Sequence, residues 1–407
     1  MKNRRLFFST ALLIPFAMTG CALGGSSHTN TPSKFYEVTF MCEDSMVNGW
    51  HVKEGELCEP LDRVDKDYYT FEGWYTDTTY KTEYDFSKPI TQNVTVYAKM
   101  RENTIKTVDD LIALNDSTLM WRVKNDIDCS SVSEWIPITN FSGSLDGQDH
   151  TISGINITEN SNYIGLFGRL YGYILNLNVV VNINVAGENT NSSAASYFGV
   201  GGICGGIESA TKDDQVKNVS VKGTVYAPNR SYVGGVIGNS PDRIVGAINE
   251  ATVTGKDCVG GIIGKQHSGN GQMSTSGIFD CVNKGAVTGG SFVGGIVGAM
   301  NNNYRVDDKN LYQTCWRNTN EGAVSGTKEV GGIIGEYISE FKSEYIKLSL
   351  KECVSKGSVT SENEAAGLVG RLRASFIDYW STNTVTAAIT GNPSAKLYID
   401  NAGNPHN

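Results

Sequence analysis

The chain has 407 residues, of which 40% are hydrophobic and 10% aromatic, a composition that suits folded domains and excludes a disordered chain. Its 46 glycines and only 9 prolines, without a collagen period, indicate many tight turns or close backbone contacts. The net charge of −9 gives an acidic surface that repels phosphate groups, and this excludes nucleic acid as a partner.

Residues 1–20 have the pattern of an export signal. Lys2, Arg4 and Arg5 form a positive segment, and Leu6–Phe16 is an apolar run of the length found in signal peptides. That run is too short to cross a bilayer as a permanent anchor, and no later segment reaches about eighteen consecutive apolar residues. We therefore expect an exported protein.

The residues that end this segment, Ala17-Met18-Thr19-Gly20-Cys21, resemble the lipobox of bacterial lipoproteins, although a Leu usually stands where Met18 lies. The resemblance implies that Cys21 is acylated and becomes the new N-terminus, so that a lipid holds the protein to the membrane at the bacterial cell surface. The alternative is an ordinary cleavable signal with an unrelated cysteine. Residues 21–35 are small and polar, which suits a flexible leash.

Eight cysteines remain once Cys21 is set aside, and an even number in an exported protein suggests disulfides. Their spacing is irregular, however, and four lie among aliphatic residues, where we expect small core side chains: Cys204, Cys258, Cys281 and Cys353. Cys42 and Cys58 lie within one small module and form the favoured pair, but their pairing stays open. A structural zinc site is not expected, because the sequence has no Cys-x-x-Cys motif.

Residues 36–101 form a small module of predicted strands. Tyr36–Phe40, Tyr69–Asp77 and Val94–Lys99 are rich in aromatic and β-branched residues, and a turn is expected around Asn48-Gly49.

The module resembles the Listeria–Bacteroides repeat, also called the internalin B-type repeat. The signature residues are Phe71–Tyr75, Asp85-Phe86 and Thr91–Ala98. The resemblance implies a small β-grasp-like domain in cell-surface proteins, used as a spacer or a weak interaction module. From the residues themselves, Trp74 and Tyr75 are expected to anchor a small core, with exposed stacking of Trp74 on a sugar as the alternative.

Residues 105–120 change to a helical pattern. Thr107 and Asp110 form a capping box at the start of a short amphipathic helix. Such a helix would cover the exposed end of a solenoid, which otherwise presents an apolar cross-section.

A Gly-aliphatic-x-Gly element, here called a glycine segment, recurs seven times at intervals of 26 to 37 residues. Its glycine pairs are Gly165 and Gly168, Gly202 and Gly205, Gly235 and Gly238, Gly261 and Gly264, Gly295 and Gly298, Gly332 and Gly335, and Gly367 and Gly370. We expect these glycines to have a structural role, by allowing positive φ at corners and close approach of neighbouring coils.

A second element, such as Ala251–Gly255 or Gly322–Gly326, lies between most glycine segments. Each repeat therefore offers two predicted short strands, which cannot form a core alone but can stack coil on coil with aliphatic ladders inside. The interval exceeds one minimal coil, so excursions are expected at Asn301–Tyr312 and Ser339–Lys347.

This array, with the lead-in Phe141–Gly154, resembles the GLUG-motif family over about residues 105–400. The resemblance implies a right-handed parallel β-helix on secreted or surface proteins. The family includes streptococcal immunoglobulin A peptidases, in which catalysis belongs to a separate metallopeptidase domain. The expected fold is thus mainly β: a β-grasp-like domain, a short capping helix and a parallel β-helix.

Catalytic chemistry has little support in the sequence. The five histidines are His28, His51, His150, His267 and His406, and none begins the His-Glu-x-x-His motif of zinc peptidases. Asp213-Asp214 and Asp307-Asp308 are expected in solvated loops. Asp146-Gly147 predicts a turn, although Asp146, Asp149 and His150 could form an acid–base cluster. The glycine runs match no nucleotide-binding fingerprint. We therefore expect no catalytic residue, metal or cofactor.

The favoured hypothesis is a surface lipoprotein that acts as an adhesion or ligand-binding module for a host or cell-wall protein or glycan. The alternatives are a pectate-lyase-like polysaccharide-active enzyme and a passive surface stalk. Converging carboxylates or arginines would favour the enzyme. An exposed aromatic cluster would favour binding, and four residues are candidates for it: Tyr171, Tyr173, Tyr232 and Trp316.

Overall fold

The computed structural model describes residues 33–188, 198–208, 214–267, 277–302, 311–339, 346–373, 382–392, 398–399 and 405–406. Within them the chain forms two compact units, one of residues up to 64 with 73–99 and one of residues 65–72 with 100 onward. No helix in these ranges is long and apolar enough to cross a membrane. The predicted signal, Cys21 and most of the predicted leash lie outside the described residues.

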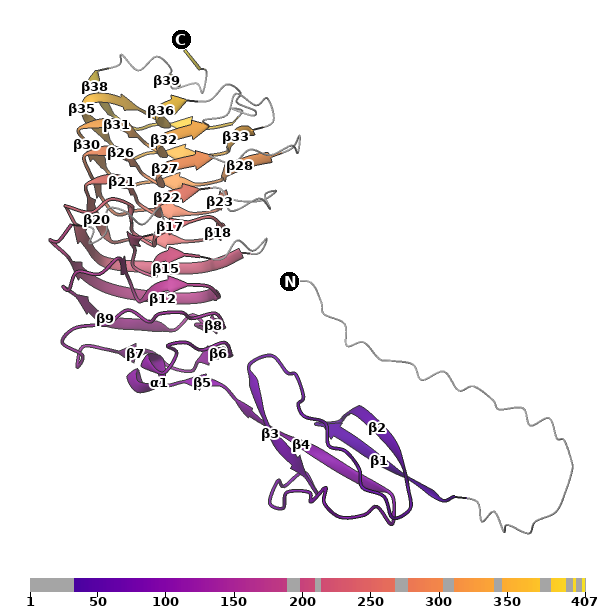
Figure 1. The fold of residues 1–407 in the computed structure, drawn as a ribbon. Helices are drawn as coiled ribbons and strands as arrows, with labels where there is room; N and C mark the ends of the chain where they lie inside the picture. The colour runs from indigo at the N-terminus through magenta and orange to yellow at the C-terminus, as the bar shows by residue number, and fades with distance from the viewer. Residues whose placement is uncertain are drawn as a thin grey trace, which may run out of the picture. The chain divides into compact units, whose positions relative to one another are not determined.

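The N-terminal unit is built on one small mixed sheet (Figure 1). Its strands are β1 (Phe35–Cys42), β2 (Ser45–Lys53), β3 (Tyr69–Tyr75) and β4 (Val94–Glu102). Their order is β2-β1-β4-β3, with β1 antiparallel to β2 and parallel to β4. This is the small β-grasp-like sheet expected from the sequence.

The expected turn at Asn48-Gly49 is wrong. Both residues lie inside β2, where they pair with Phe40 and Thr39. The chain turns instead after β1, where Glu43 adopts a φ of 55°. The pairing of a long β1 with β2 outweighs the local turn preference of Asn-Gly.

Trp74 anchors the core of this unit, as predicted. Its side chain is 3% exposed, its ring centre lies 4.8 Å from that of Phe40, and its Nε1 donates a 2.9 Å hydrogen bond to the Leu61 carbonyl oxygen. A buried ring cannot stack on an external sugar, so that alternative is wrong. Cys58 is a buried free thiol, and the favoured disulfide with Cys42 is therefore absent from the structure.

The second unit is a solenoid whose N-terminal end carries helix α1 (Figure 1). The helix spans only Val108–Ile112, shorter than the pattern over 105–120 predicted. The capping box is present: the Asp110 amide donates to Thr107 Oγ1 over 3.2 Å, and the Thr107 amide donates to Asp110 Oδ2 over 3.0 Å. Leu111 and Leu114 are fully buried and pack into the solenoid core.

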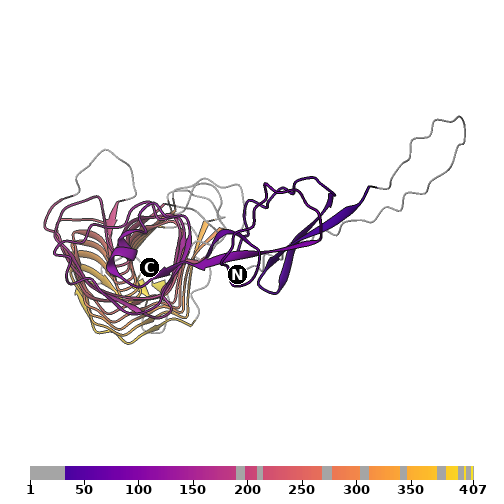
Figure 2. The same cartoon turned by 90° about the horizontal axis from the view of Figure 1, so that it is seen from below.

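The solenoid winds parallel strands coil on coil, which confirms the expected parallel β-helix (Figure 2). Its first strands are β5 (Thr104–Ile105), β6 (Met120–Val123), β7 (Ile127–Asp128), β8 (Ser144–Asp146), β9 (Thr151–Ile157), β10 (Tyr163–Ile164), β11 (Phe167–Leu170), β12 (Tyr173–Asn184), β13 (Gly199–Val200), β14 (Cys204–Ile207), β15 (Asp214–Ala227), β16 (Val233–Gly234) and β17 (Ile237–Ser240).

The following coils are the most regular. They comprise β18 (Arg243–Val245), β19 (Ile248–Asn249), β20 (Thr252–Gly255), β21 (Asp257–Gly260), β22 (Ile263–His267), β23 (Gly277–Phe279), β24 (Val282–Asn283), β25 (Val287–Thr288), β26 (Ser291–Gly294), β27 (Val297–Asn302), β28 (Leu311–Trp316), β29 (Thr319–Asn320), β30 (Val324–Gly326), β31 (Lys328–Gly331), β32 (Ile334–Ser339), β33 (Ile346–Lys351), β34 (Val354–Ser355), β35 (Val359–Ala366), β36 (Val369–Arg373), β37 (Thr384–Val385) and β38 (Ile389–Asn392). Beyond them β39 (Tyr398–Ile399) pairs antiparallel with β40 (Pro405–His406).

Each regular coil has five short strands, so the expectation of two strands per repeat is wrong. A strand of one coil pairs with the fifth strand after it, as β18 does with β23 and β23 with β28. The expected excursions partly extend β27, β28, β32 and β33, and residues 303–310 and 340–345 lie outside the described residues.

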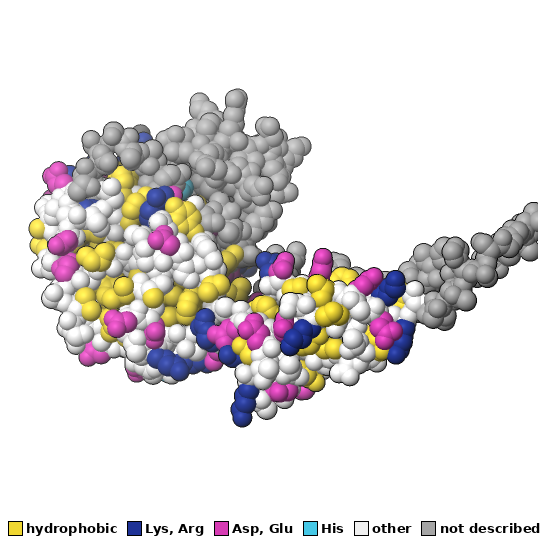
Figure 3. Space-filling view, turned by 60° about the horizontal axis from the view of Figure 1, so that its bottom comes forward, with side chains coloured by type: hydrophobic (Ala, Val, Ile, Leu, Met, Phe, Trp, Pro, Cys, Tyr) yellow, Lys and Arg dark blue, Asp and Glu magenta, His cyan; other side chains and the backbone are white. Residues whose placement is uncertain are grey.

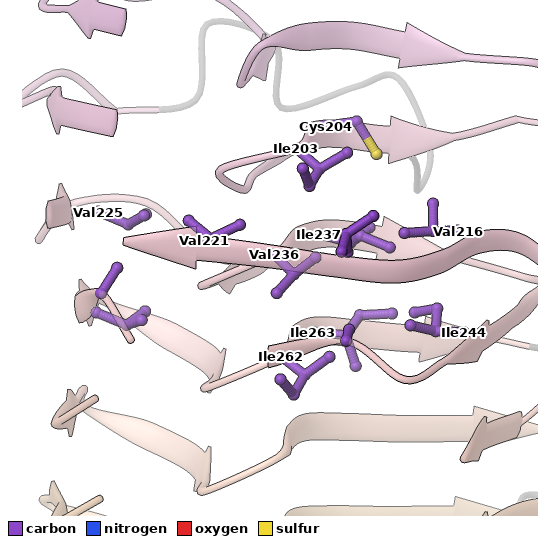
Figure 4. Close-up of a cluster of buried hydrophobic side chains, with 14 of the residues drawn as sticks. Ile203, Cys204, Val216, Val221, Val225, Val236, Ile237, Ile244, Ile262 and Ile263 are labelled. Atoms are coloured by element: carbon purple, nitrogen blue, oxygen red, sulfur yellow. The ribbon is translucent and has the colours of Figure 1, made fainter. Parts of the chain in front are cut away.

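Aliphatic ladders fill the inside of the solenoid (Figure 4). In one ladder Cys204, Ile237 and Ile263 follow one another in register, and all three are fully buried. Burial of each such side chain stabilises the fold by about 1.5–3 kcal/mol. Cys281 and Cys353 are also buried core residues, as predicted, whereas Cys258 is only partly buried at a corner.

The glycine segments lie at the turn between two strands of a coil, as Gly261–Gly264 does between β21 and β22. A Cβ on Gly261 would lie 2.2 Å from the Gly295 carbonyl oxygen in the next coil. None of the fourteen segment glycines has a positive φ, so that part of the expectation is wrong. The positive φ values belong to residues just before the segments, such as Tyr232 at 62° and Cys258 at 53°.

Candidate binding face

The outward side of strands β20, β25, β30, β35 and β38 forms a continuous face, here called the outer face. The five strands pair in parallel and in register. A Val or Ile stands at or next to the start of each strand, between two outward-pointing residues. In the first four strands its side chain points inward and is buried: Val253, Val287, Val324 and Val359. Because side chains alternate along a strand, the residues on either side of these valines point outward.

A row of hydroxyl groups runs along the outer face, one from each strand. The row consists of Thr254, Thr288, Ser325, Thr360 and Thr390, which follow one another in register. The hydroxyls of Thr288 and Ser325 are 3.1 Å apart, within hydrogen-bonding distance. Neighbouring parallel strands lie about 4.8 Å apart, so the row is a regular array of donors and acceptors. A second outward row is also small: Thr252, Ala286, Ala323, Ser358 and Ala388.

Tyr226 lies at one end of the hydroxyl row. It belongs to β15 and pairs in register with Thr254. Its side chain is 42% exposed, which makes it one of the few large exposed side chains of the described solenoid. An exposed tyrosine offers a flat apolar surface and a polar hydroxyl together.

A row of alternating charge borders the outer face. Glu250 accepts from Lys284 over 2.9 Å and from Lys222 over 3.1 Å, and Lys356 pairs with Glu321 over 3.0 Å. The hydrogen bonds from Lys284 and then Lys222 lower the pKa of Glu250, and the bond to Glu250 raises the pKa of Lys284. The lysines and glutamates therefore neutralise one another along the row.

Buried asparagines support the outer face from within. Asn249 Nδ2 donates to Asn283 Oδ1 over 2.8 Å, and Asn283 Nδ2 donates to Asn320 Oδ1 over 2.8 Å. Each amide also donates to the backbone carbonyl two residues on, in Ala251, Gly285 and Gly322. This ladder, here called the asparagine ladder, fixes the corner just before β20, β25 and β30.

The acid–base cluster considered around Asp146 does not form. Asp146 Oδ1 accepts from the Gln148 amide over 3.2 Å, which is the turn that the sequence predicted. His150 Nδ1 lies 3.3 Å from Asp126 Oδ1 instead. Asp214 is paired with Lys217 and Arg243, whereas residues 213, 307 and 308 are not described. Among the described residues, no group of three or more His, Cys, Asp or Glu could hold a metal ion.

One buried ion cluster was not predicted from the sequence. The Arg371 guanidinium binds Glu329 and lies 3.4 Å from Glu336 Oε1. Burial raises the pKa of Glu336 to about 7. The side chains of Glu329 and Glu336 are 8% and 7% exposed, so the carboxylates are sheltered from large molecules. Arg371 comes from the coil after the two glutamates, and only the register brings the three together.

The four candidate aromatic residues do not form an exposed cluster. All four are partly buried. A cationic side chain lies over the ring of three of them: Arg169 over Tyr171 at 5.5 Å, Lys265 over Tyr232 at 4.7 Å and Lys351 over Trp316 at 5.7 Å. The exposed Tyr226 was not among them. Where Figure 3 shows the surface, acidic and basic side chains are interspersed and no extended basic area is visible.

Comparison with known proteins gives three matches. Residues 36–99 match the Listeria-Bacteroides repeat domain. Halomucin from Haloquadratum walsbyi (strain DSM 16790 / HBSQ001) is 32% identical over 156 residues, which cover 33% of this chain and 2% of halomucin. The chain thus corresponds to a very small part of that relative's length. The two matches favour a surface or extracellular repeat protein.

The third match is a crystal structure at 1.30 Å resolution of a candidate immunoglobulin A1 protease from Bacteroides ovatus. It is 16% identical with a TM-score of 0.46, over 75% of this chain and 92% of that one. A similarity at this level carries no functional argument.

Proposed function

We propose that this protein is a bacterial surface lipoprotein that binds a glycan on the outer face of its solenoid. The carrying observation is the exposed Tyr226 in register with a row of five hydroxyl side chains. The lipobox resemblance around Cys21 and the GLUG-motif resemblance support a position at the cell surface. The N-terminal unit then serves as a spacer between the lipid and the solenoid.

A glycan suits this surface better than a protein does. Sugar rings stack their apolar C–H faces on aromatic rings, and their hydroxyls bond to hydroxyl side chains. Protein interfaces are instead built around several large buried anchors such as Trp, Tyr and Arg. The outer face offers Tyr226 at one end and rows of small side chains, with Ile389 of the last strand as a further large exposed residue.

A glycan array probed with the full chain tests this proposal. Tyr226→Ala is expected to weaken glycan binding roughly three- to tenfold, the range of one aromatic contact. Thr288→Val and Thr360→Val together are expected to weaken it further without loss of the β-branched shape. Trp50→Ala is the matched control, because Trp50 is a 46% exposed aromatic residue of the N-terminal unit. Binding that survives the Tyr226 and threonine changes, or no glycan binding at all, would contradict the proposal.

The lipid anchor has its own test. In bacteria fed an alkyne-tagged fatty acid, the full chain is expected to carry the tag and to sediment with membranes. Cys21→Ser is expected to abolish the tag and release the protein to the soluble exported fraction, whereas Cys204→Ser leaves both unchanged. A tagged Cys21→Ser protein would contradict lipidation at Cys21.

The polysaccharide-active alternative has one favourable observation, the cluster of Glu329, Glu336 and Arg371. A carboxyl group with a pKa near 7 suits a general acid. Its burial argues against it, because a polymer must reach the acid. Cleavage of a polysaccharide by the full chain, abolished by Glu336→Gln, would favour the enzyme and contradict a purely binding role.

A further inference from the structure

Two cysteines of consecutive coils meet inside the solenoid. Cys315 lies in β28, and Cys353 lies just before β34 in the next coil. Both are free thiols in the structure and fully buried, with their Sγ atoms 3.9 Å apart. Cys353 Sγ also donates to the Cys315 carbonyl oxygen over 3.2 Å. The two thiols are therefore in van der Waals contact, with no side chain between them.

The sulfur contact, and not the strand register, places the two cysteines for a covalent link. Cys315 pairs in register with Leu350, and Cys353 follows three residues later in the same coil. Disulfide formation needs the two sulfur atoms to approach to about 2.05 Å, with Cα atoms usually 4.4–6.8 Å apart. The two cysteines are not register partners; the chain bends between Leu350 and Cys353, where Glu352 adopts a φ of 55°, and the two Sγ atoms lie 3.9 Å apart.

We propose that Cys315 and Cys353 form a disulfide when the chain folds in an oxidising compartment, and that this bond fixes two consecutive coils to each other. The two thiols lose two protons and two electrons to a disulfide oxidant RSSR, which leaves as two RSH, and one S–S bond forms. The proposal does not depend on glycan binding.

The timing of this step follows from burial. Exchange needs a thiolate as nucleophile, and the hydrogen bond with Cys353, together with burial, raises the pKa of Cys315 well above its usual value. Oxidation is therefore expected while the second coil docks on the first, before both sulfur atoms lose access to the oxidant. Once formed, the bond closes a loop between residues 38 apart and restricts the unfolded chain.

Thiol counting on the refolded full chain tests the proposal. The protein is reduced and unfolded, refolded in a mixture of reduced and oxidised glutathione, quenched with acid, and alkylated in denaturant. Intact mass is expected to show two fewer alkylated thiols than a dithiothreitol-treated sample, and peptide mapping is expected to show one cross-linked pair joining Cys315 to Cys353. The mapping needs no variant, so a misfolding variant leaves the test intact.

Three variants sharpen the result. Cys315→Ser and Cys353→Ser are each expected to remove the cross-link and leave the remaining partner alkylated. Cys204→Ser, a buried cysteine of another coil, is expected to keep it. Full alkylation of the wild-type chain, or a cross-link that joins Cys353 to Cys281, would overturn the proposal. A cross-linked chain with the same thermal midpoint as its reduced form would overturn the fixing role.

Discussion

The asparagine ladder consists of single residues whose side chains add hydrogen bonds to those that the backbone makes between coils. Asn249, Asn283 and Asn320 are completely buried, yet each side chain bonds to an asparagine of a neighbouring coil and to the backbone of its own coil. A buried amide whose hydrogen bonds are satisfied in this way costs little folding free energy, and its bonds fix one register between neighbouring coils. A coil displaced by one residue would leave these amides unpaired inside the core.

Removal of one ladder member tests this role. Asn283→Ala is expected to lower the free energy of unfolding by about 2–3 kcal/mol. The substitution removes the donor to Asn320 Oδ1 and the acceptor for Asn249 Nδ2, both inside the core. Asn182→Ala is the control, since Asn182 makes a 2.8 Å bond to Asn156 on the exposed surface. Urea unfolding of both variants measures the difference, and equal losses would refute a special role for the buried ladder.

Glu336 gives the solenoid a pH-dependent stability. Burial raises the pKa of Glu336 to about 7 from the value of 4.5 expected in the unfolded chain. The folded state therefore binds this proton more tightly, and the stability it contributes is present below pH 4.5 and is lost as pH rises through 7. The loss amounts to roughly 3 kcal/mol at most, from 1.36 kcal/mol per pKa unit.

Urea unfolding at pH 5 and at pH 8 measures this effect. Glu336→Gln is expected to remove most of the decline between the two, because its side chain cannot ionise. Glu321→Gln, an exposed glutamate of the charge row, is expected to leave the decline unchanged. A Glu336→Gln variant with the wild-type decline would show that other groups cause it.

At the scale of elements, the glycine segments differ in how tightly they pack. The second glycine of the fourth segment, Gly264, would place a Cβ 2.4 Å from the backbone of Tyr232 and Val233. The second glycine of the first segment, Gly168, would place it no closer than 3.4 Å to any atom. The same position of the motif therefore has no room for a methyl group in one coil and has room for it in another.

The two positions give a matched pair of substitutions. Gly264→Ala is expected to destabilise the fold by at least ~2 kcal/mol, because backbone must move to accept the methyl group. Gly168→Ala is expected to change stability by less than ~1 kcal/mol, since the methyl group has room. Thermal unfolding of both variants measures the difference. Similar losses would mean that the segment glycines are needed for flexibility and not for close approach.

The sequence predicted the elements that repeat over many residues and missed those set by contacts between coils. Parallel strands and the core positions of Cys204, Cys281 and Cys353 follow from aliphatic patterns. The number of five strands per coil could not be predicted, because strands of two residues, such as β24, are too short to show an alternation of apolar and polar residues. Tyr232 and Cys258 take positive φ values because the register of neighbouring coils forces the corner, against their local preference.

The candidate site was only partly visible in the sequence. The x-Val-Thr/Ser pattern that forms the hydroxyl row is present in Thr252–Thr254 and Ala286–Thr288. Its meaning depends on which side chains point outward, and the buried valines decide that only in the folded chain. The cluster of Glu329, Glu336 and Arg371 had no sequence signal, because its members are joined only by stacking.

At the scale of the whole molecule, a solenoid is stabilised by contacts between adjacent coils. A central strand such as β25 pairs on both sides, with β20 and β30. Within the described residues, β38 pairs with β35 alone, at the C-terminal end of the stack. Local opening should therefore begin at an end and spread inward.

Hydrogen exchange measured by mass spectrometry tests this gradient. Amides of β20, β25 and β30 are expected to exchange at least tenfold more slowly than those of β38, because opening a central coil breaks two interfaces. Peptides from α1 report on the covered N-terminal end and are expected to be intermediate. Uniform exchange along the solenoid would indicate one all-or-none unfolding unit.

The alternating lysines and glutamates beside the outer face also affect how a ligand arrives. Opposite charges one strand apart, about 4.8 Å, cancel within a distance shorter than the roughly 8 Å screening length of physiological saline. A charged ligand in solution therefore experiences no long-range electrostatic attraction to this surface before it comes into contact with it. The association rate on this side of the solenoid is therefore set by random collision. The dissociation rate of the ligand depends on its direct contacts with the hydroxyl groups and the tyrosine ring.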